Sequence, residues 1–140
     1  MPVTAIKSIR NGTGVGCYVR NLENPNDTDR NGQPHALAPG EVWQCNMWIP
    51  WADTQDQFDH GSGIGKGPAH INITFVWSSL EDAPPPHEFA IWQSGDYVRY
   101  SKNLSWVNNG QLVPGNSTVG GDRSVDIVGT DGQDADVNFY

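Results

Sequence analysis

Trp48 and Trp51 are two tryptophans close enough along the chain to contact one ligand. An exposed indole stacks on the apolar face of a pyranose ring, or lies at the headgroup level of a bilayer. Alternation in the preceding segment predicts Trp48 on the outward side of a strand, whereas Trp51 follows Pro50 in a loop. The two rings therefore form a candidate ligand-binding loop. The alternative is that they only close one end of the fold.

A second cluster mixes aromatic and charged side chains in residues 91–100. Trp92 is expected to point outward at the tip of a hairpin with Gln93, because Phe89 and Ile91 fall on the inward phase. The returning strand then places Tyr97 and Arg99 on the same surface, with Asp96 nearby. A sugar site needs this combination of an aromatic ring and planar polar groups that bind vicinal hydroxyls. The alternative is a set of cross-strand pairs that only stabilise an exposed sheet face.

Metal-binding patterns are weaker. The four histidines are not spaced so as to place two imidazoles together on a strand or helix: His35, His60, His70 and His87. Residues 131–136 are as rich in carboxylates as a calcium loop, but lack the length and the final Glu of an EF-hand. A turn is the favoured interpretation of that segment. We therefore predict neither a metal ion nor a cofactor.

Catalytic motifs do not stand out either. The chain has no Gly-x-Ser-x-Gly elbow and no phosphate-binding loop followed by a helix. An enzyme is the minority hypothesis, with His70 or His87 as a base in a pocket closed by the loop 52–68.

The leading hypothesis is a non-catalytic, lectin-like module that binds a glycan. Its ligand-binding residues are those of the two clusters: Trp48, Trp51, Trp92, Asp96, Tyr97 and Arg99. We also expect a homo-oligomer, because single weak sugar sites gain affinity through multivalency. The alternatives are a membrane-interacting, lipid-binding or cytolytic protein, and a subunit of a larger assembly.

Charge and hydropathy exclude some partners. The 16 acidic and 8 basic residues give a net charge of −8, which opposes nucleic acid because phosphate binding depends on Lys and Arg. A run of about 18 apolar residues is missing, so no transmembrane helix is predicted. The first ten residues lack the order of a signal peptide, so we expect synthesis in the cytoplasm, with release or extracellular action left open.

The elements that must position these residues are short strands. With 16 Gly, 10 Pro and 6 Trp, the composition is typical of an all-β protein. The length of 140 residues predicts a single domain over 1–140. Short alternating segments separated by turn residues predict an antiparallel β-sandwich, jelly-roll-like or Greek key, with a closed barrel as second choice.

Turn signals pair several of these strands. The segments 3–9 and 15–20 flank a Gly-rich turn and are predicted to form a hairpin, as are 88–92 and 96–100. Further strands are predicted from the same signals: 104–107 and 111–113 around Asn108–Gly110, then 123–129 and 135–139. The segments 21–40 and 50–68 are predicted to be irregular.

Two segments alternate most clearly. In 41–49, Trp43, Cys45 and Met47 share one face and Trp48 lies on the other. In 69–77, alternate apolar residues face inward and His70 faces outward.

Cys17 and Cys45 both fall on the apolar phase of their strands. We interpret them as two small buried thiols. A disulfide across neighbouring or facing strands is the alternative.

Overall fold

The computed structural model describes residues 3–23, 34–61, 67–75, 88–102, 106, 110–130 and 135–140. Within these residues the chain forms ten strands and one short helix. The strands are β1 Thr4–Asn11, β2 Cys17–Asn21, β3 His35–Leu37, β4 Val42–Trp48, β5 Ile71–Phe75, β6 Glu88–Ser94, β7 Tyr97–Ser101, β8 Gln111–Leu112, β9 Gly121–Val128 and β10 Asp136–Phe139; the helix is α1 Gln55–His60.

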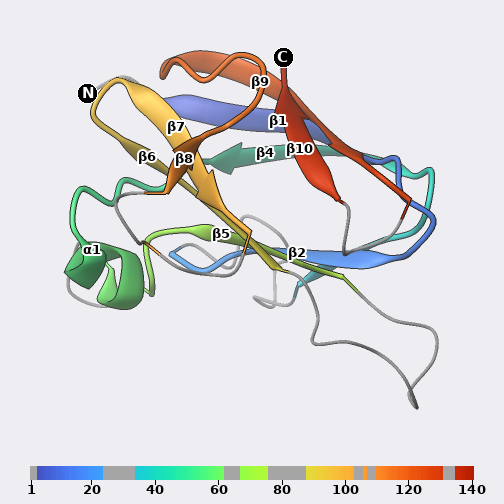
Figure 1. Ribbon diagram of the computed structural model, residues 1–140, viewed down its shortest axis with the longest axis horizontal. Helices are drawn as coiled ribbons and strands as arrows, with labels where there is room; N and C mark the ends of the chain where they lie inside the picture. Colours follow the sequence, from blue (N-terminus) through green and yellow to red (C-terminus); the bar gives the residue numbers. More distant parts are fainter. Residues whose placement is uncertain are drawn as a thin grey trace.

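The strands form two separate sheets, and the described residues do not close into a barrel. One sheet has four strands in the order β10-β9-β1-β4, and the other has six in the order β3-β2-β5-β6-β7-β8. Figure 1 shows β1, β4, β9 and β10 in the upper part of the molecule, with β2 and β5 below them. Every ladder is antiparallel except that of β1 with β9, which is parallel.

The two sheets share one apolar core, because alternate residues of their strands point to the same interior. In β5 these residues are Ile71, Ile73 and Phe75, as predicted. In β4, Trp43, Cys45 and Met47 face the core, while Trp48 lies on the opposite face, again as predicted.

The predicted hairpin of 3–9 with 15–20 is wrong. β1 pairs with β4 and β9 in the four-stranded sheet, whereas β2 pairs with β3 and β5 in the six-stranded sheet. The Gly-rich turn therefore carries the chain from one sheet to the other. By contrast, the predicted hairpin of β6 with β7 is confirmed.

Asn11 explains why the chain can change sheets at this turn. Its buried side-chain amide donates to the carbonyl oxygens of Val15 at 2.8 Å and Leu37 at 3.1 Å. Its side-chain oxygen accepts from the backbone N–H of Thr13 at 3.0 Å and from the hydroxyl at 2.6 Å. The turn thus leaves no polar atom of this buried amide unsatisfied.

Both segments predicted to be irregular contain regular structure. β3 lies in the first of them, and α1 in the second. The later strands at 123–129 and 135–139 correspond to β9 and β10. The strand 104–107 lies largely outside the described residues, as do His87 and residues 131–134 of the acidic turn.

Cys17 and Cys45 are both free thiols and form no disulfide with each other. Cys17 lies on β2 in one sheet, and Cys45 lies on β4 in the other. Burial raises the pKa of each thiol to about 12, so both are protonated at neutral pH.

Candidate functional site

Trp48 is one of the two most exposed large apolar side chains of the described chain. It lies on the outer face of the four-stranded sheet, the face turned away from the core, and is 59% exposed. Its neighbour across the ladder is Ala5, a small and buried residue, so the indole has no bulky neighbour on that side. Gln44 and Asn46 precede it on the same face and are also exposed.

Tyr140 provides a second exposed ring on this face, at the opposite edge of the sheet. It exchanges two backbone hydrogen bonds with Ser124, at 2.9 and 3.2 Å, and is 59% exposed. The register places Ser124 beside Ser8, and Ser8 beside Gln44. A polar row therefore joins the two edge strands, which are about 14 Å apart by the usual strand spacing.

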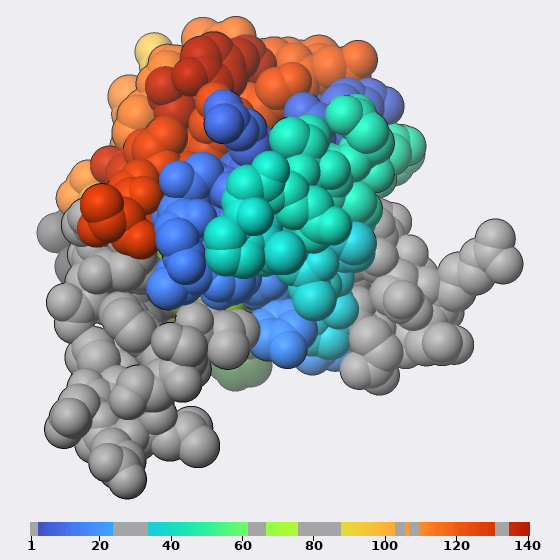
Figure 2. All heavy atoms as spheres, turned by 90° about the vertical axis from the view of Figure 1, so that its right-hand side faces the viewer, coloured from blue at the N-terminus to red at the C-terminus, as the bar shows by residue number. Residues whose placement is uncertain are grey.

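We call this surface the Trp48 face. It includes Ser8, Gln44, Asn46, Trp48, Ser124, Asn138 and Tyr140, together with the charged residues Arg10 and Asp126. Figure 2 shows the strands that carry it following one another across the surface, from the last strands (orange to red) through β1 (blue) to the segment 34–48 (teal).

Two hydrogen bonds orient polar groups of the Trp48 face. The ammonium of Lys7 donates to the side-chain oxygen of Asn46 at 2.7 Å, and the amide of Asn138 donates to the hydroxyl of Tyr140 at 3.0 Å. The first bond uses one lone pair of the Asn46 oxygen, so the second lone pair and the NH₂ group can still bind a ligand.

Trp51 lies apart from this face, in the segment between β4 and α1 that passes beside β6. It is half-buried and forms an isolated parallel bridge with Gln93. The bridge is fixed by two backbone bonds, from Gln93 N–H to the oxygen of Pro50 at 2.7 Å and from Ala52 N–H to the oxygen of Gln93 at 2.9 Å. The two tryptophans of the predicted loop therefore lie in different environments.

The side chain of Gln93 ties this loop to both sheets. Its amide donates to the carbonyl oxygen of Ile49, and its oxygen accepts from the hydroxyl of Thr4 at 2.7 Å. That hydroxyl accepts in turn from the backbone N–H of Gly120 at 2.6 Å. All these groups are mutually satisfied at the end of the core, so the route of the chain after Trp48 is fixed.

The predicted exposure of Trp92 is wrong: its side chain is 0% exposed. It does point away from the shared core, as its phase requires, but a second apolar cluster covers it there. Phe58 of α1 meets its ring edge-to-face, with centroids 5.0 Å apart. The rest of this cluster is Ala52, Ala69, Ala90 and the half-buried Trp106.

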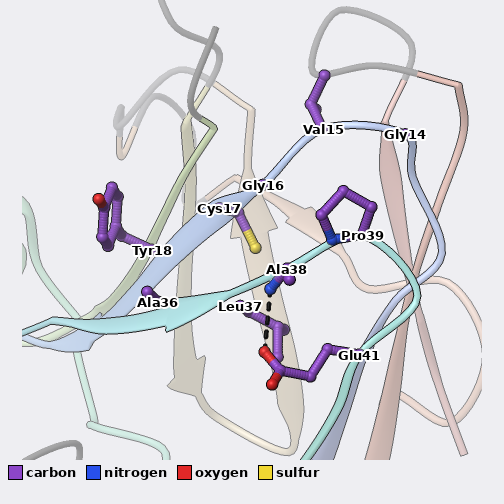
Figure 3. A pocket seen from close by; sticks show the side chains of 10 residues that line it. All are labelled: Gly14, Val15, Gly16, Cys17, Tyr18, Ala36, Leu37, Ala38, Pro39 and Glu41. Atoms are coloured by element: carbon purple, nitrogen blue, oxygen red, sulfur yellow. Dashed lines mark hydrogen bonds between the residues drawn. The ribbon is translucent and has the colours of Figure 1, made fainter. Parts of the chain in front are cut away.

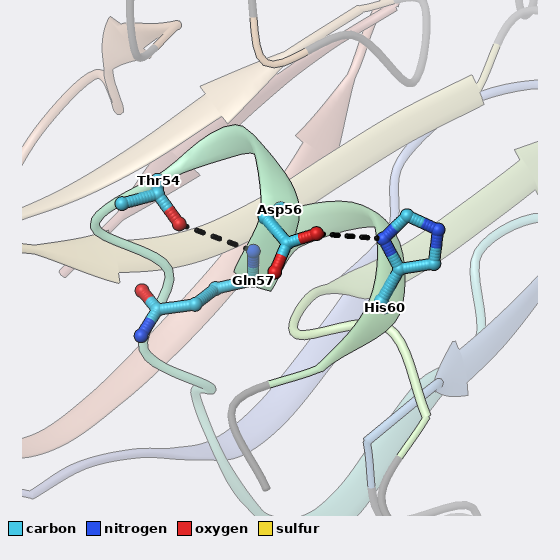
Figure 4. A network of polar contacts seen from close by, with 4 residues as sticks. All are labelled: Thr54, Asp56, Gln57 and His60. Carbon is cyan, nitrogen blue, oxygen red and sulfur yellow. Dashed lines mark hydrogen bonds and ion pairs between the residues drawn. The ribbon is translucent and has the colours of Figure 1, made fainter.

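A cap at its first turn stabilises α1, the helix that covers Trp92. The hydroxyl of Thr54 accepts from the backbone N–H of Gln57 at 3.2 Å, and His60 pairs with Asp56 at 3.2 Å one turn earlier (Figure 4). Threonine followed three residues later by glutamine is a capping-box pattern, and this signal alone could have revealed the helix. The burial of Trp92 could be predicted only once this helix was recognised, because Phe58 of α1 covers the ring.

His70 was expected to point outward, but it is 6% exposed and lies under α1. Its Nδ1 is 3.1 Å from the carbonyl oxygen of Phe58, and the two rings stack with centroids 4.1 Å apart. Since a carbonyl oxygen only accepts, Nδ1 carries the proton. Burial lowers the pKa of His70, against smaller opposing effects of this hydrogen bond and of Asp59.

Asp96, Tyr97 and Arg99 remain together at the β6–β7 hairpin. Asp96 and Tyr97 are exposed, and Arg99 is half-buried beside Trp92 in the register. The carboxylate of Asp53 holds this hairpin, accepting from the hydroxyl of Ser94 at 2.9 Å. The hairpin belongs to the six-stranded sheet, so it does not form one site with Trp48.

A pocket of about 510 Å³ lies at one end of β2 and β3. Its lining is mostly apolar, and the sulfur of Cys17 points toward the Leu37–Ala38 segment while Tyr18 points away (Figure 3). The one carboxylate, Glu41, accepts from the backbone N–H of Ala38 at 3.0 Å. The pocket offers few groups that could bind a sugar hydroxyl.

Within the described ranges, no three His, Cys, Asp or Glu side chains come together as metal ligands. None of the helical segments in the described part of the chain is long and apolar enough to cross a bilayer.

No protein-family model, curated protein or solved structure matches this chain. Its function therefore has to be inferred from its own side chains.

Proposed function

We propose that the chain is a non-catalytic carbohydrate-binding protein and that the glycan binds on the Trp48 face. The observation that supports this best is the 59% exposure of the Trp48 ring on an ordered strand. An ordered, exposed indole costs little further entropy when it stacks on a ligand. The amides of Gln44 and Asn46 beside it both donate and accept, as vicinal hydroxyls require.

The dimensions of the face favour an extended glycan over a single sugar. Trp48 and Tyr140 lie on the two edge strands, with Ser8 and Ser124 in the polar row between them. Three strand spacings of about 4.8 Å separate these edges. One sugar would stack on each ring, and those between would bind the hydroxyls and amides. The surface is open rather than enclosed, so the affinity per site would be modest.

The hairpin residues Asp96, Tyr97 and Arg99 form a second candidate subsite, with Tyr97 as its ring at 40% exposure. Trp92 has no direct role in this proposal, because it is buried. Trp51 would act by holding the loop after Trp48.

The fold that suits this proposal is a β-sandwich. Two sheets that contribute to one apolar core support it, and the outer face of the four-stranded sheet then remains open to a ligand.

The test is a broad glycan array with the labelled protein, with and without calcium. We expect binding to one class of extended glycan. Trp48→Ala should weaken it about tenfold, since a ring stack contributes on the order of 1 kcal/mol beyond its area. Tyr18→Ala is the matched control, because it removes an exposed ring from the other sheet. Tyr97→Ala reports on the second subsite.

Two results would contradict the proposal. One is a folded Trp48→Ala protein that keeps full glycan affinity. The other is an empty array combined with flotation on neutral, sterol-rich vesicles, which would favour the membrane-interacting alternative. Neutral vesicles are the relevant probe, because the net charge of −8 opposes anionic lipids.

A further inference from the structure

β4 is the edge strand of the four-stranded sheet, and none of the described residues forms a strand on its far side. At both ends of β4, odd-numbered residues direct their backbone groups toward β1: Asn11 N–H donates to the oxygen of Glu41, and Ile49 N–H donates to the oxygen of Thr4, each at 2.9 Å. The even-numbered residues between them therefore face the free edge.

Hydrogen bonding at this edge is incomplete. The even-numbered residues are Val42, Gln44, Asn46 and Trp48. The carbonyl oxygen of Trp48 accepts one bond, from the side-chain amide of Asn21 at 3.1 Å, and retains a second lone pair.

The edge has few of the features that normally prevent pairing; the one present is a register shift in the ladder of β4 with β1, between Ile6 and Ser8. Lysine and other charged residues, and proline, also oppose the addition of another strand when they lie on an edge strand. β4 reads Val-Trp-Gln-Cys-Asn-Met-Trp and contains none of them, although the chain as a whole has a net charge of −8. Its side chains alternate without interruption over all seven residues. The neighbouring cations lie on β1: Lys7 binds the Asn46 side chain, and Arg10 lies opposite Val42.

The outward-facing side chains of β4 are complementary to themselves. In an antiparallel pair with a two-fold axis at Cys45, the middle residue, Val42 of each copy lies opposite Trp48 of the other. Gln44 lies opposite Asn46 of the second copy. Apolar side chains thus meet at both ends and amides meet between them. The same register pairs only residues whose backbone groups face the edge, as a hydrogen-bonded ladder requires.

We propose that two copies of this chain pair antiparallel through β4, with Cys45 on the two-fold axis, and so form one continuous eight-stranded sheet. The outer faces stay open, and the two Trp48 rings lie on one surface, six residues or about 20 Å apart along the strands. The dimer does not depend on glycan binding. If the proposed function holds as well, the dimer supplies two sites to one branched or repeated glycan.

The test is sedimentation equilibrium of the full chain without glycan, at protein concentrations from about 1 µM to about 1 mM. Weak specific interfaces have dissociation constants in this range. We expect a monomer–dimer equilibrium. Asn46→Pro should raise its dissociation constant about tenfold or more, because it removes an N–H that faces the edge. Asn46→Ala, which keeps that N–H and loses the same side chain, should change the constant by no more than about threefold.

Charged variants test the register, and they also serve if Asn46→Pro fails to fold. Gln44→Glu and Asn46→Lys should each weaken the dimer, and mixing the two proteins should restore association, because Glu then lies opposite Lys. A monomer at every concentration would overturn the proposal, as would larger open polymers or equal effects of Pro and Ala at position 46. Failure of the mixed variants to associate would overturn the register. Glycan affinity is measured separately, so loss of one proposal leaves the other intact.

Discussion

Gly110 lies against Trp92 in a conformation that few other residues adopt. Its φ is 63°, and a Cβ added there would lie 2.5 Å from Cη2 of Trp92 and 2.6 Å from the oxygen of Tyr100. We expect Gly110→Ala to lower the free energy of unfolding by about 3 kcal/mol, from backbone strain and overpacking together. Urea denaturation would measure this loss.

The control is Gly95→Ala. Gly95 has nearly the same φ, 61°, but no heavy atom lies within 4 Å of an added Cβ. Only the backbone cost should remain there, about 1 kcal/mol. Equal losses at the two glycines would mean that the backbone conformation, rather than contact with Trp92, requires glycine at position 110.

At the scale of elements, alternation was enough to predict strands but not what covers them. β4 and β5 were predicted with the correct faces because the apolar period is local to each strand. The same rule gave the correct phase for Trp92, yet its burial depends on α1, more than thirty residues earlier. Trp48, assigned by the same kind of pattern, is exposed because no described element lies over its face.

Sheet membership was harder to predict than strand identity. β1 and β2 follow each other closely and were expected to pair, but β1 instead lies between β4 and β9. A turn rich in Gly and Asn fits a hairpin and a crossing between sheets equally well. What distinguishes them is the buried amide of Asn11, which lies on β1 and donates to the backbone of the turn at Val15 and of β3 at Leu37.

The docking of α1 on its sheet should weaken in acid through His70. The folded chain holds this imidazole neutral and lowers its pKa, whereas the unfolded chain protonates it near 6.5. Below about pH 6.5 the unfolded state therefore binds more protons, and stability falls with pH until the folded imidazole also protonates. Thermal unfolding between pH 7.5 and 5 would show this as a declining midpoint.

Two variants isolate this effect. His70→Asn keeps an N–H donor near the carbonyl of Phe58 but cannot be protonated, so its midpoint should depend less on pH than that of the wild type. His60→Asn removes an exposed histidine from the same helix and should keep the full dependence. Identical slopes in all three proteins would assign the acid sensitivity to other groups.

At the scale of the whole molecule, Gln93 joins the two sheets through its side chain. Gln93→Glu keeps an acceptor for Thr4 but places a carboxylate against the carbonyl oxygen of Ile49. We expect a loss of about 3 kcal/mol at neutral pH, because a buried charge would lack a donor. Chemical denaturation at pH 7 and pH 4 would show a smaller loss at the lower pH, where the introduced carboxyl group is protonated.

Gln111→Glu is the matched control, since Gln111 is exposed on β8. Its effect should stay within about 0.5 kcal/mol. A loss at position 93 no larger than at position 111 would mean that the two sheets are held together by their apolar core alone.

The parallel pairing of β1 with β9 has a consequence for how the chain folds. Thr4 lies opposite Gly121, so β1 waits during synthesis for a partner made more than a hundred residues later. Closing so long a loop costs entropy before the contacts of β1 with β9 can compensate, and this slows folding. Until β9 is in place, the unpaired edge of β1 is exposed to other chains. A chain truncated before β9 should therefore remain sensitive to protease across β1, because β1 lacks this partner.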